Sequence, residues 1–341
     1  MNPQECKILV TGASGFIGSF LVEKALALGF ETWAAVRPAS SRRYLTDPRI
    51  RFVELDLEDD SRLRQQLSDH VGRNGAWDYV IHAAGATKCR RAEDFFRINT
   101  GGTERLARLL VATAALRRRF VFISSLSVFG DVCGSNMQRV ITGTDTPRPD
   151  TAYGRSKLEA ERRLARTEGL KDYVVLRPTG VYGPRERDYF LMARSISRHV
   201  DFAVGRERQI LTFIYVRDLV EAVFLALEKG RSGQAYFLTD GHVYSSRTFS
   251  DLLQAELGVR TVFHFTAPLW VLRAVCLVAG RVAALLGKTS TLNTDKYNIM
   301  KQRNWQCDIS PACRELGYRP VWPLEAGVPE AVAWYKKEKW I

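Results

Sequence analysis

Short apolar runs alternate with longer segments of helical spacing over the first 180 residues of the chain. The runs are five or six residues long and rich in β-branched and aromatic side chains, which predicts strands over 7–11, 31–36, 51–55, 79–83, 120–124 and 173–177. Between them, apolar residues recur about every 3.6 positions, which predicts helices over 16–28, 61–70, 94–115 and 152–168. This alternation indicates an α/β protein with a doubly wound parallel sheet and right-handed crossovers.

The alternation ends after the Gly183-Pro184 pair. A strand over 211–216 and a helix over 219–228 predict a return to the sheet, whereas 185–209 and most of 241–341 indicate a smaller, helix-rich lobe. We therefore expect one domain that contains the sheet and spans 1–184 and 210–240. We expect a C-terminal substrate lobe over 185–209 and 241–341.

Three glycines, Gly12, Gly15 and Gly18, follow the first predicted strand and open the first predicted helix in the run VTGASGFIG. A loop of this kind turns tightly, lets a pyrophosphate approach the backbone, and points N–H groups at its charge from a helix N-terminus. A glycine triplet alone is weak evidence. Its place between an apolar strand and an amphipathic helix makes it typical of a Rossmann dinucleotide site.

The end of the second predicted strand indicates which dinucleotide binds. An enzyme that uses NAD normally has an acidic side chain here for the ribose 2′-OH, but this chain has Arg37, followed by two serines, Arg42 and Arg43. A guanidinium pairs with a 2′-phosphate, so we expect NADP(H). The alternative is that Arg37 is a solvated loop residue. Asp56, after the third strand, either accepts a hydrogen bond from the adenine amino group or serves a turn.

Tyr153 and Lys157 are four residues apart in YGRSK on a predicted helix, and so share one face at a separation of about 6 Å. A free phenol with a pKa of about 10 is a poor proton donor or acceptor at neutral pH. A neighbouring ammonium and an oxidised nicotinamide both favour the phenolate, which predicts a pKa of Tyr153 drawn toward the working range. Ser125, after the fifth predicted strand, supplies a hydroxyl to hold a substrate oxygen.

The chain resembles the extended short-chain dehydrogenase/reductase family, also called the NAD-dependent epimerase/dehydratase family. The resemblance covers nearly the whole chain through the runs TGASGFIG, HAAG, INTGGT, SSLSVFG, YGRSK, LRPTGVYGP and FIYVRDL. It implies a Rossmann-type α/β fold with a small C-terminal substrate lobe, which matches the break after Pro184.

The resemblance also implies roles for individual residues. Ser125, Tyr153 and Lys157 form a catalytic triad, and Asn99 supports it. Lys157 also holds the nicotinamide ribose. The motifs and the resemblance together place these residues along the cofactor: Gly12, Ser14, Gly15, Phe16, Ile17, Gly18, Arg37, Arg42, Asp56, Leu57, Ala83, Ala84, Gly85, Tyr153, Lys157, Pro178, Thr179 and Val181.

Local departures from the family pattern select among its branches. Dehydratases resemble one another in an Asp-Glu pair directly after the strand-end serine or threonine, where this chain has Leu126 and Ser127, so we expect no dehydration of that type. Sugar-nucleotide enzymes commonly have Arg-Tyr/Phe-x-Asn after the sixth strand, whereas this chain has RPTG at 177–180. These differences, with Arg37, favour a reductase similar to the 3β-hydroxysteroid dehydrogenase and dihydroflavonol reductase branches.

We therefore expect NADPH-dependent reduction of a ketone on a hydrophobic substrate. The favoured classes are a long-chain β-keto lipid of the 3-ketosphinganine type and a steroid-like ketone. Tyr153 donates the proton, and Lys157 lowers its pKa and orients the cofactor. The alternatives are an NDP-sugar epimerase or reductase, and a non-catalytic NADP-binding sensor or assembly factor.

Eight side chains of the second half either line an apolar substrate pocket or form core. They are Tyr189, Phe190, Met192, Phe202, Phe213, Tyr215, Phe237 and Trp270.

The charge of the chain limits its partners. Lysine and arginine outnumber aspartate and glutamate by 50 to 37, a formal net charge of +13. Nucleic acid, an anionic membrane surface and a phosphorylated cofactor are all attracted by such a surplus. The basic residues are dispersed and accompany no recognisable nucleic-acid-binding module, so we expect no nucleic-acid partner.

The six cysteines show no C-x-x-C spacing and no histidine at metal-ligand spacing, so we expect reduced core thiols without disulfides or a metal site. The N-terminus has no basic segment followed by an apolar one, so we expect no classical export signal and a cytoplasmic location. The sequence leaves open whether the chain forms a homodimer.

The segment 268–288 is the most apolar part of the chain and is nearly long enough to cross a bilayer. Two arginines within it oppose crossing, and Arg273, Arg281 and Lys288 fall within roughly 80° of one another on a helical wheel. This pattern predicts a helix in the membrane interface, with its basic stripe at anionic headgroups. The alternative is that its apolar face closes the substrate lobe.

Overall fold

A seven-stranded parallel sheet forms the centre of the computed structural model, which describes residues 3–134, 136–205, 207–285 and 294–341. The strand order is β11-β6-β5-β4-β1-β2-β3, and every neighbouring pair is parallel. The strands are β1 (Lys7–Thr11), β2 (Glu31–Val36), β3 (Arg51–Glu54), β4 (Trp77–His82), β5 (Leu116–Ile123), β6 (Tyr173–Pro178) and β11 (Ala235–Leu238). The predicted doubly wound α/β class is confirmed.

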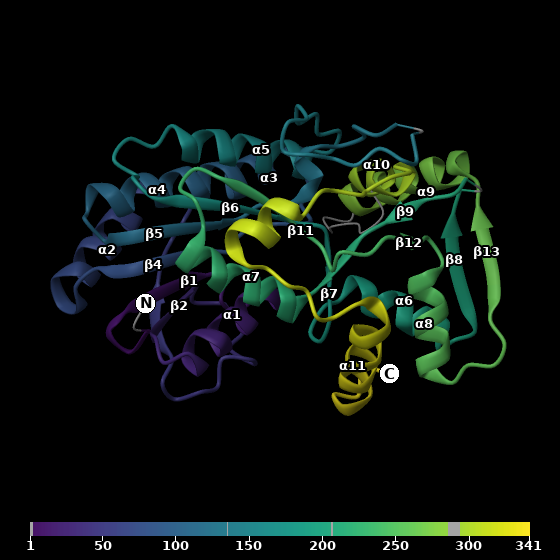
Figure 1. Cartoon of the computed structure of the whole chain (residues 1–341), viewed down its shortest axis with the longest axis horizontal. Helices are drawn as coiled ribbons and strands as arrows, with labels where there is room; N and C mark the ends of the chain where they lie inside the picture. The colour runs from purple at the N-terminus through teal and green to yellow at the C-terminus, as the bar shows by residue number, and fades with distance from the viewer. Residues whose placement is uncertain (1–2, 135, 206, 286–293) are drawn as a thin grey trace.

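Helices cover both faces of the sheet (Figure 1). On one face lie α2 (Asp60–Asn74), α4 (Gly102–Ala112) and α5 (Ala152–Ala165), and on the other lie α1 (Phe16–Ala27) and α7 (Val216–Lys229). Alternate side chains of β1 enter the two cores, because successive residues of a strand point to opposite faces. Leu9 packs with the α2, α4 and α5 side chains, and Ile8 and Val10 pack with those of α1 and α7.

The strand order reverses direction between β1 and β4. The chain runs outward from β1 to β2 and β3, and then returns to place β4 on the other side of β1, with Thr11 opposite His82. A crevice forms at the carboxyl ends of the strands where such a reversal occurs, and ligands of doubly wound proteins bind there. The sheet therefore places the candidate dinucleotide site between the ends of β1 and β4.

A smaller lobe packs beside the carboxyl ends of the sheet. Its core contains Tyr182, Phe213 and Phe249, which come from segments far apart in the chain. Its elements are β7 (Gly180–Tyr182), α6 (Asp188–Ile196), β8 (Val200–Val204), β9 (Ile210–Leu211), β10 (Phe213–Tyr215), β12 (Tyr244–Ser245), α8 (Thr248–Leu257), β13 (Phe263–Ala267), α9 (Leu269–Leu285), α10 (Thr294–Lys301) and α11 (Leu324–Lys337). Three two-stranded pairs lie here, β7 with β10, β8 with β13 and β9 with β12.

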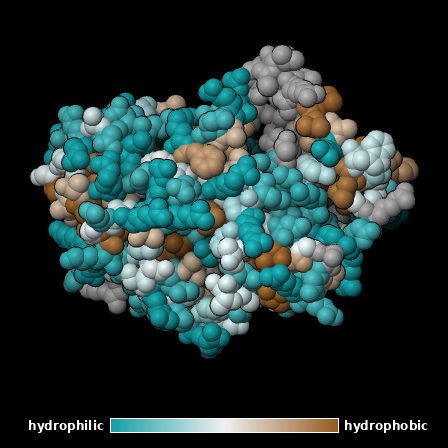
Figure 2. Space-filling view, turned by 90° about the horizontal axis from the view of Figure 1, so that it is seen from above, coloured by the Kyte–Doolittle hydropathy of each residue, from teal (hydrophilic) through white to brown (hydrophobic). Residues whose placement is uncertain are grey.

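The helix α9 is apolar on more than one side. Leu272 and Cys276 are buried against the lobe, whereas Trp270, Leu277 and Val278 are exposed. Figure 2 shows brown and tan side chains gathered at this end of the molecule. One side of the helix is therefore buried, and a second apolar side is left uncovered by the described residues. Lys288 lies outside the described residues.

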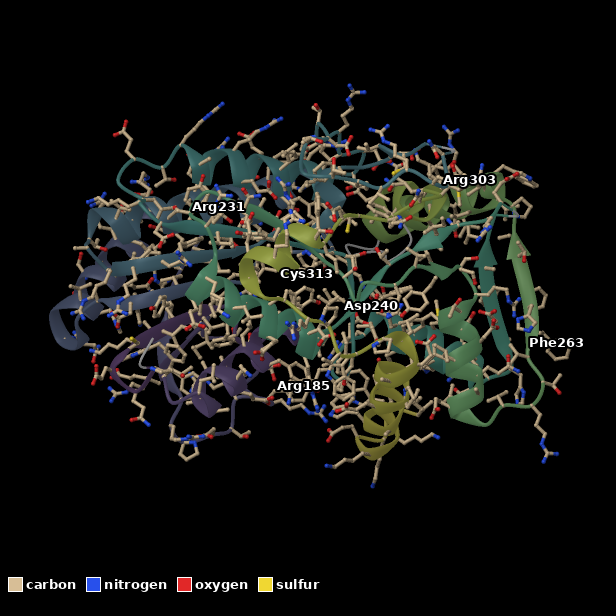
Figure 3. The ribbon with its side chains drawn as sticks, viewed as in Figure 1. Arg185, Arg231, Asp240, Phe263, Arg303 and Cys313 are labelled. Atoms are coloured by element: carbon tan, nitrogen blue, oxygen red, sulfur yellow. The ribbon has the colours of Figure 1, made fainter. Side chains whose placement is uncertain are left out.

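Arg185, directly after β7, ties the chain between the two lobes to the first helix (Figure 3). Its guanidinium donates to Ser19 Oγ at 2.9 Å and pairs with Glu23 at 2.6 Å, and it lies over the rings of Phe20 and Tyr44. The backbone at Arg185 has a positive φ of 74°.

The division of the chain at 184, 210 and 240 into two domains stays a prediction.

Two predictions about elements are corrected by the structure. The strand predicted at 211–216 does not return to the main sheet, because β10 pairs with β7 in the smaller lobe. The returning strand is β11, which pairs with β6 and was not predicted. Its four residues are too few for a periodic pattern. The helix predicted over 94–115 is interrupted: α3 (Ala92–Phe95) and a π-helical segment (Phe96–Gly101) precede α4.

Cys6, Cys133, Cys276 and Cys307 are buried. Within the described part of the chain no group of three or more His, Cys, Asp or Glu residues is arranged to hold a metal ion. In the same part, no helix is long and apolar enough to cross a membrane.

Candidate active site

The glycine loop lies at the reversal of the sheet, between the ends of β1 and β4. Gly12 has a φ of +68°, and a Cβ there would lie 2.7 Å from the Ala84 nitrogen and 2.8 Å from the Ala83 carbonyl carbon. A Cβ on Gly18 would overlap the Gly12 carbonyl. The two glycines are therefore required for the turn and for the packing of α1 against it. No side chain caps α1 at Gly15, so its N-terminal N–H groups are suited to a pyrophosphate.

Arg37 is exposed at the carboxyl end of β2, where the adenosine end of a dinucleotide lies in this fold. Its backbone N–H donates to Ser40 Oγ at 2.9 Å, and within the described residues no acidic side chain pairs with its guanidinium. Arg42 lies over the ring of Phe52, at 4.2 Å from its centroid. Arg37 is thus a free cation at the predicted place.

Asp56 serves the turn after β3. Its Oδ1 accepts the Glu58 N–H at 3.0 Å, and its Oδ2 lies 3.5 Å from Arg62. Two roles were expected for Asp56, and these contacts support the role in the turn. Leu57 follows it, and its carbonyl accepts a hydrogen bond from Arg105 of α4.

A chain of hydrogen bonds fixes the loop after β4. Thr103 donates its hydroxyl hydrogen to the Asn99 carbonyl, so His82 Nε2 donates to Thr103 Oγ1 at 2.9 Å. In the neutral ring Nδ1 then accepts from Thr11 Oγ1 at 2.7 Å, and Thr11 Oγ1 also accepts the Ala84 N–H. Complete burial, with a smaller contribution from Lys157, lowers the pKa of His82 to about 3, so this histidine is neutral. Its ring joins the end of β1 to the start of α4 through hydrogen bonds on both nitrogens.

Asn99 lies in the π-helical segment with its side chain fully used. Its Oδ1 accepts the Ala86 N–H at 2.7 Å, and its Nδ2 donates to the Ala86 carbonyl and to Ser156 Oγ. The segment around Gly85 is thereby fixed against α5. A Cβ on Gly85 would lie 3.1 Å from Asn99 Oδ1 and 3.2 Å from Lys157 Nζ. Asn99 therefore lies near Lys157, the position expected of a supporting residue.

Ser125, Tyr153 and Lys157 come together at the carboxyl end of β5. Ser125 begins the turn after the strand, and its side chain lies near enough to the Tyr153 hydroxyl to act on the pKa of that phenol. Tyr153 and Lys157 lie on the first two turns of α5. Lys157 is buried, and its Nζ donates to the Ile123 carbonyl at 2.8 Å and lies 4.7 Å from the centre of the Phe122 ring.

The protonation of the two residues follows from their burial. Burial raises the pKa of Tyr153, and the Ser125 hydrogen bond opposes this with a smaller effect. The sequence predicted the opposite direction, from the Lys157 ammonium together with an oxidised nicotinamide. In the chain without the nucleotide, burial dominates and the ammonium bonds to the Ile123 carbonyl. Burial also lowers the pKa of Lys157 to about 8, and Glu161 partly offsets this.

Glu161, one turn after Lys157 on α5, is the centre of a buried polar group that the sequence did not reveal. It pairs with Arg177 of β6 at 2.6 Å and accepts a hydrogen bond from Ser124 Oγ. Arg177 also lies over the rings of Phe129 and Phe237. The four-residue separation of Lys157 from Glu161 was the one sequence feature that could have indicated this contact, because residues four apart share a helix face. The group holds α5 against the ends of β5 and β6.

Replacing Glu161 by glutamine is expected to move the pH dependence of the site. Glu161 raises the pKa of Lys157, so its loss lowers that pKa further below about 8. The alkaline limb of the kcat/KM profile should then shift to lower pH by roughly one unit. Glu159→Gln, on the same helix and paired with exposed Arg163, is the matched control. An unchanged alkaline limb in a folded Glu161→Gln protein would contradict this coupling.

The start of α5 is held from outside the sheet domain. Thr151 accepts the Gly154 N–H at 2.9 Å, as an N-cap residue. Asp295 of α10 accepts the Ala152 N–H at 3.0 Å and the Tyr153 N–H at 3.1 Å. A carboxylate at this position also favours the helix dipole. Asp295 therefore fixes the backbone of the candidate proton donor, and nothing in its local sequence indicated this.

The predicted nicotinamide side is formed by the segment that joins β6 to β7. Pro178 ends β6, Thr179 Oγ1 bonds to Thr212 at 2.8 Å, and Val181 packs beside the α1 and α7 core. A Cβ on Gly180 would overlap the hydroxyl of Tyr189. Tyr189 thus fills the space where sugar-nucleotide enzymes commonly have an asparagine side chain.

Most of the candidate pocket-lining residues form core instead. Phe213, Tyr215 and Phe237 are buried, and Tyr189, Phe190 and Met192 pack against the core of the smaller lobe. The exceptions are Phe202 and Trp270, which are 65% and 74% exposed.

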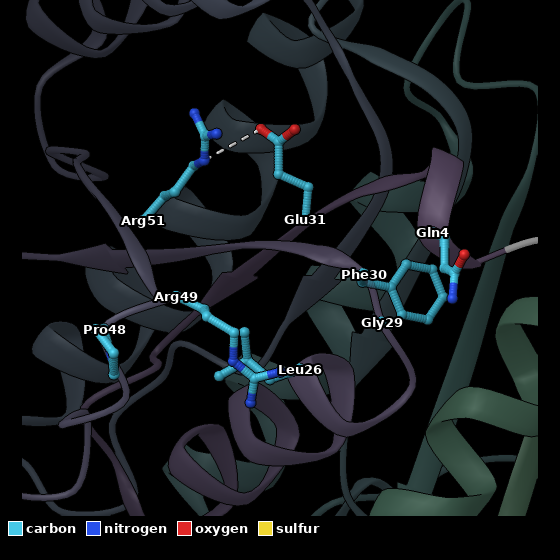
Figure 4. Close-up of a pocket in the computed structure, with 8 residues that line it drawn as sticks. All are labelled: Gln4, Leu26, Gly29, Phe30, Glu31, Pro48, Arg49 and Arg51. Atoms are coloured by element: carbon cyan, nitrogen blue, oxygen red, sulfur yellow. Dashed lines mark ion pairs between the residues drawn. The ribbon is translucent and has the colours of Figure 1, made fainter.

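A cavity elsewhere on the molecule is not part of this site. Gln4, Gly29, Glu31, Arg49 and Arg51 are among the residues that line it, and it lies at the amino ends of β1, β2 and β3 (Figure 4). Ligands of this fold bind at the carboxyl ends, so we assign this cavity no role in catalysis.

Three comparisons agree with this geometry. The NAD dependent epimerase/dehydratase family matches residues 8–239. The chain is 28% identical to a 4-hydroxy-2-methyl-3-oxo-4-farnesyl-3,4-dihydroquinoline-1-oxide ketoreductase of Stigmatella aurantiaca, over 92% of this chain and 91% of the relative. It is 26% identical to a UDP-glucose 4-epimerase of Vibrio cholerae, over 94% and 92%. The crystal structure of DesIV from Streptomyces venezuelae, a dTDP-glucose 4,6-dehydratase with NAD and TYD bound, shares the fold with a TM-score of 0.76 at 23% identity, over 98% of both chains.

Proposed function

Because the chain belongs to the NAD dependent epimerase/dehydratase family, we propose that it is an NADPH-dependent ketoreductase acting on a hydrophobic ketone. The observation that carries the proposal is the joining of Ser125, Tyr153 and Lys157 at the carboxyl end of β5, beside the glycine loop. A phenol kept protonated by burial suits a proton donor, and therefore suits the direction of reduction.

The residues present fit a dinucleotide: a glycine turn without a side-chain cap, a free guanidinium at the end of β2, and a buried lysine at the nicotinamide end. When bound, NADPH supplies the hydride for the carbonyl carbon. Ser125 and Tyr153 hold the carbonyl oxygen between their hydroxyls. Tyr153 gives its proton to that oxygen as negative charge develops there, and Lys157 stabilises the resulting phenolate and binds the nicotinamide ribose.

The substrate class rests on two observations. One is the similarity to a ketoreductase whose named substrate carries a farnesyl chain. The other is Tyr189, whose hydroxyl occupies the space next to Gly180 that a nucleotide-binding asparagine would need. A long-chain β-keto lipid of the 3-ketosphinganine type is our first candidate, and a steroid-like ketone is the second.

An NDP-sugar epimerase or reductase is the alternative supported by the similarity to UDP-glucose 4-epimerase. Oxidation of NADPH followed at 340 nm, with long-chain β-keto lipids, steroid ketones and UDP- or dTDP-sugars offered in parallel, decides between the classes. Turnover of a sugar nucleotide alone would overturn the ketoreductase proposal. Binding of NADPH without turnover of any class would favour the sensor or assembly factor.

Replacing Arg37 by aspartate is expected to reverse the cofactor preference. A carboxylate repels the 2′-phosphate, so the Michaelis constant for NADPH should rise by at least about tenfold while that for NADH changes little. Arg49→Asp makes the same charge change at the amino end of β3 and is the matched control. Equal use of NADH and NADPH by the unmodified protein would contradict the assignment.

We also propose that the enzyme works in the cytoplasm, at a membrane surface. The positive net charge and the hydrophobic substrate class support this location. Fractionation of cells into soluble and membrane portions tests it. Recovery in the soluble portion at low salt as well as high salt would contradict membrane association.

A further inference from the structure

Exposed apolar side chains are concentrated at one end of the smaller lobe. Of the twelve large hydrophobic residues that are exposed in the described chain, seven lie on β8, β13 and α9. Scattered exposed residues need no explanation, whereas a contiguous group indicates an interaction site. We call this group the apolar face: Phe202, Phe263, Phe265, Trp270, Val275, Leu277 and Val278.

The pairing of β8 with β13 builds the first half of the apolar face. Phe202 is the register partner of Phe265, and their rings stack with centroids 5.8 Å apart. Phe263 is two residues from Phe265 and so shares its side of the strand, at the outer edge of the lobe (Figure 3). The alternate positions turn away: His264 lies 3.1 Å from Asp201, which is buried.

The helix α9 builds the second half. Leu272 and Cys276 fix one side of the helix to the lobe, so Trp270, Leu277 and Val278 point outward. Beneath the exposed side chains, Asp201 is the buried residue of β8, and Leu272 and Cys276 are buried on α9.

The charges around the apolar face are basic. Between residues 257 and 294 the chain has four lysines or arginines and no aspartate or glutamate. Arg260 and Arg273 are exposed, and within the described residues neither has an acidic partner. Of the acidic groups near these arginines, Asp201 is buried beside His264 and Glu207 pairs with Arg303 at 3.0 Å. Glu256, four residues before Arg260, is exposed.

We propose that the apolar face docks on an anionic membrane surface, with the aromatic rings among the acyl chains and Arg260 and Arg273 at the headgroups. Aromatic and aliphatic side chains bordered by arginines match the chemistry of that interface. A second copy of the chain fits less well. A two-fold contact would bring the same unpaired arginines together without an acidic partner.

The surface adjoins the catalytic helix. The helix α10 packs against α9, and it bonds to the start of α5 through Asp295 and through Asn298, whose Nδ2 donates to the Asp150 carbonyl at 2.9 Å. Figure 1 shows α9 and α10 together at the same end. Docking would therefore bring the membrane to the side of the molecule from which Tyr153 is held. That consequence rests on the proposed function, whereas the docking itself does not.

Flotation of the full chain with vesicles tests the docking. Vesicles of phosphatidylcholine alone are compared with vesicles that also contain phosphatidylglycerol, at low and high salt. The unmodified protein is expected to float with the anionic vesicles, and less so at high salt. The double variant Phe265→Glu with Trp270→Glu should lose this binding by more than about tenfold. Both positions are exposed, so the variant is expected to fold, which its melting temperature checks.

The matched control is Val321→Glu, an equally exposed apolar residue outside the face, which should bind vesicles like the unmodified chain. Failure of the unmodified protein to bind anionic vesicles would overturn the proposal. So would dimerisation in sedimentation equilibrium that the double variant abolishes while vesicle binding persists. Ketone reduction is measured separately without vesicles, so a soluble ketoreductase and a membrane-bound protein without that activity are distinguishable outcomes.

Discussion

Replacing Tyr153 by phenylalanine should remove nearly all turnover while leaving NADPH binding almost unchanged. The substitution deletes the hydroxyl that lies beside Ser125 and is proposed to protonate the substrate oxygen, and it changes little volume. Loss of a positioned general acid costs roughly a hundred- to ten-thousand-fold in rate. Steady-state kinetics with the best ketone and titration of NADPH binding by fluorescence measure the two effects.

The control for this variant is Tyr79→Phe. Tyr79 lies near the amino end of β4, where its hydroxyl accepts a hydrogen bond from Arg118 at 3.2 Å, far from the proposed chemistry. The Tyr79→Phe variant also loses one phenol oxygen, and its kcat should remain close to that of the unmodified enzyme. Undiminished turnover in Tyr153→Phe would remove Tyr153 from the mechanism.

Replacing Lys157 by methionine should reduce both turnover and cofactor affinity. The ammonium donates to the Ile123 carbonyl and is proposed to bind the nicotinamide ribose and the phenolate of Tyr153. A hydrogen bond from a charged group contributes about 1.5–3 kcal/mol, so the Kd for NADPH is expected to rise by roughly ten- to a hundredfold, with a larger fall in kcat.

Folding should survive this change. Methionine is similar in length, and burial already lowers the pKa of Lys157 to about 8, which means that the charge is costly where it lies. The melting temperature should therefore not fall far. Lys24→Met, at a half-buried position on α1 that pairs with Glu221, is the matched control. NADPH affinity equal to that of the unmodified protein would show that Lys157 does not contact the cofactor.

The parts of this site that the sequence predicted are local in the chain. The glycine loop is fixed by a strand, a turn and a helix within a dozen residues, and the separation of Tyr153 from Lys157 is one turn of a helix. Five of the first six strands of the sheet have at least five residues, which is long enough to carry an apolar pattern. Each of these features depends on backbone geometry that neighbouring residues determine.

The missed parts depend on contacts between distant segments. Glu161 meets Arg177 only because β6 lies beside β5, and Asp295 reaches Tyr153 across 142 positions. The direction of the Tyr153 pKa was missed because burial is a property of the whole fold, whereas the sequence displays only the neighbouring charge. The apolar face was foreseen on α9 alone, because the pairing of Phe202 with Phe265 joins strands that are far apart in sequence.

The hydrogen bonds from Asp295 to the first turn of α5 have a consequence for the order in which the molecule is completed. During synthesis, every strand of the sheet has been made before residue 295 emerges, since the last of them ends at Leu238. A nascent chain can therefore assemble its dinucleotide crevice before Asp295 is available to bond to the backbone of Tyr153, the proposed proton donor. The carboxylate that fixes the backbone at Tyr153 is therefore added with the C-terminal quarter of the polypeptide. We expect the chain to become active only at this late step, after the glycine loop and the sheet that form the nucleotide site have been made.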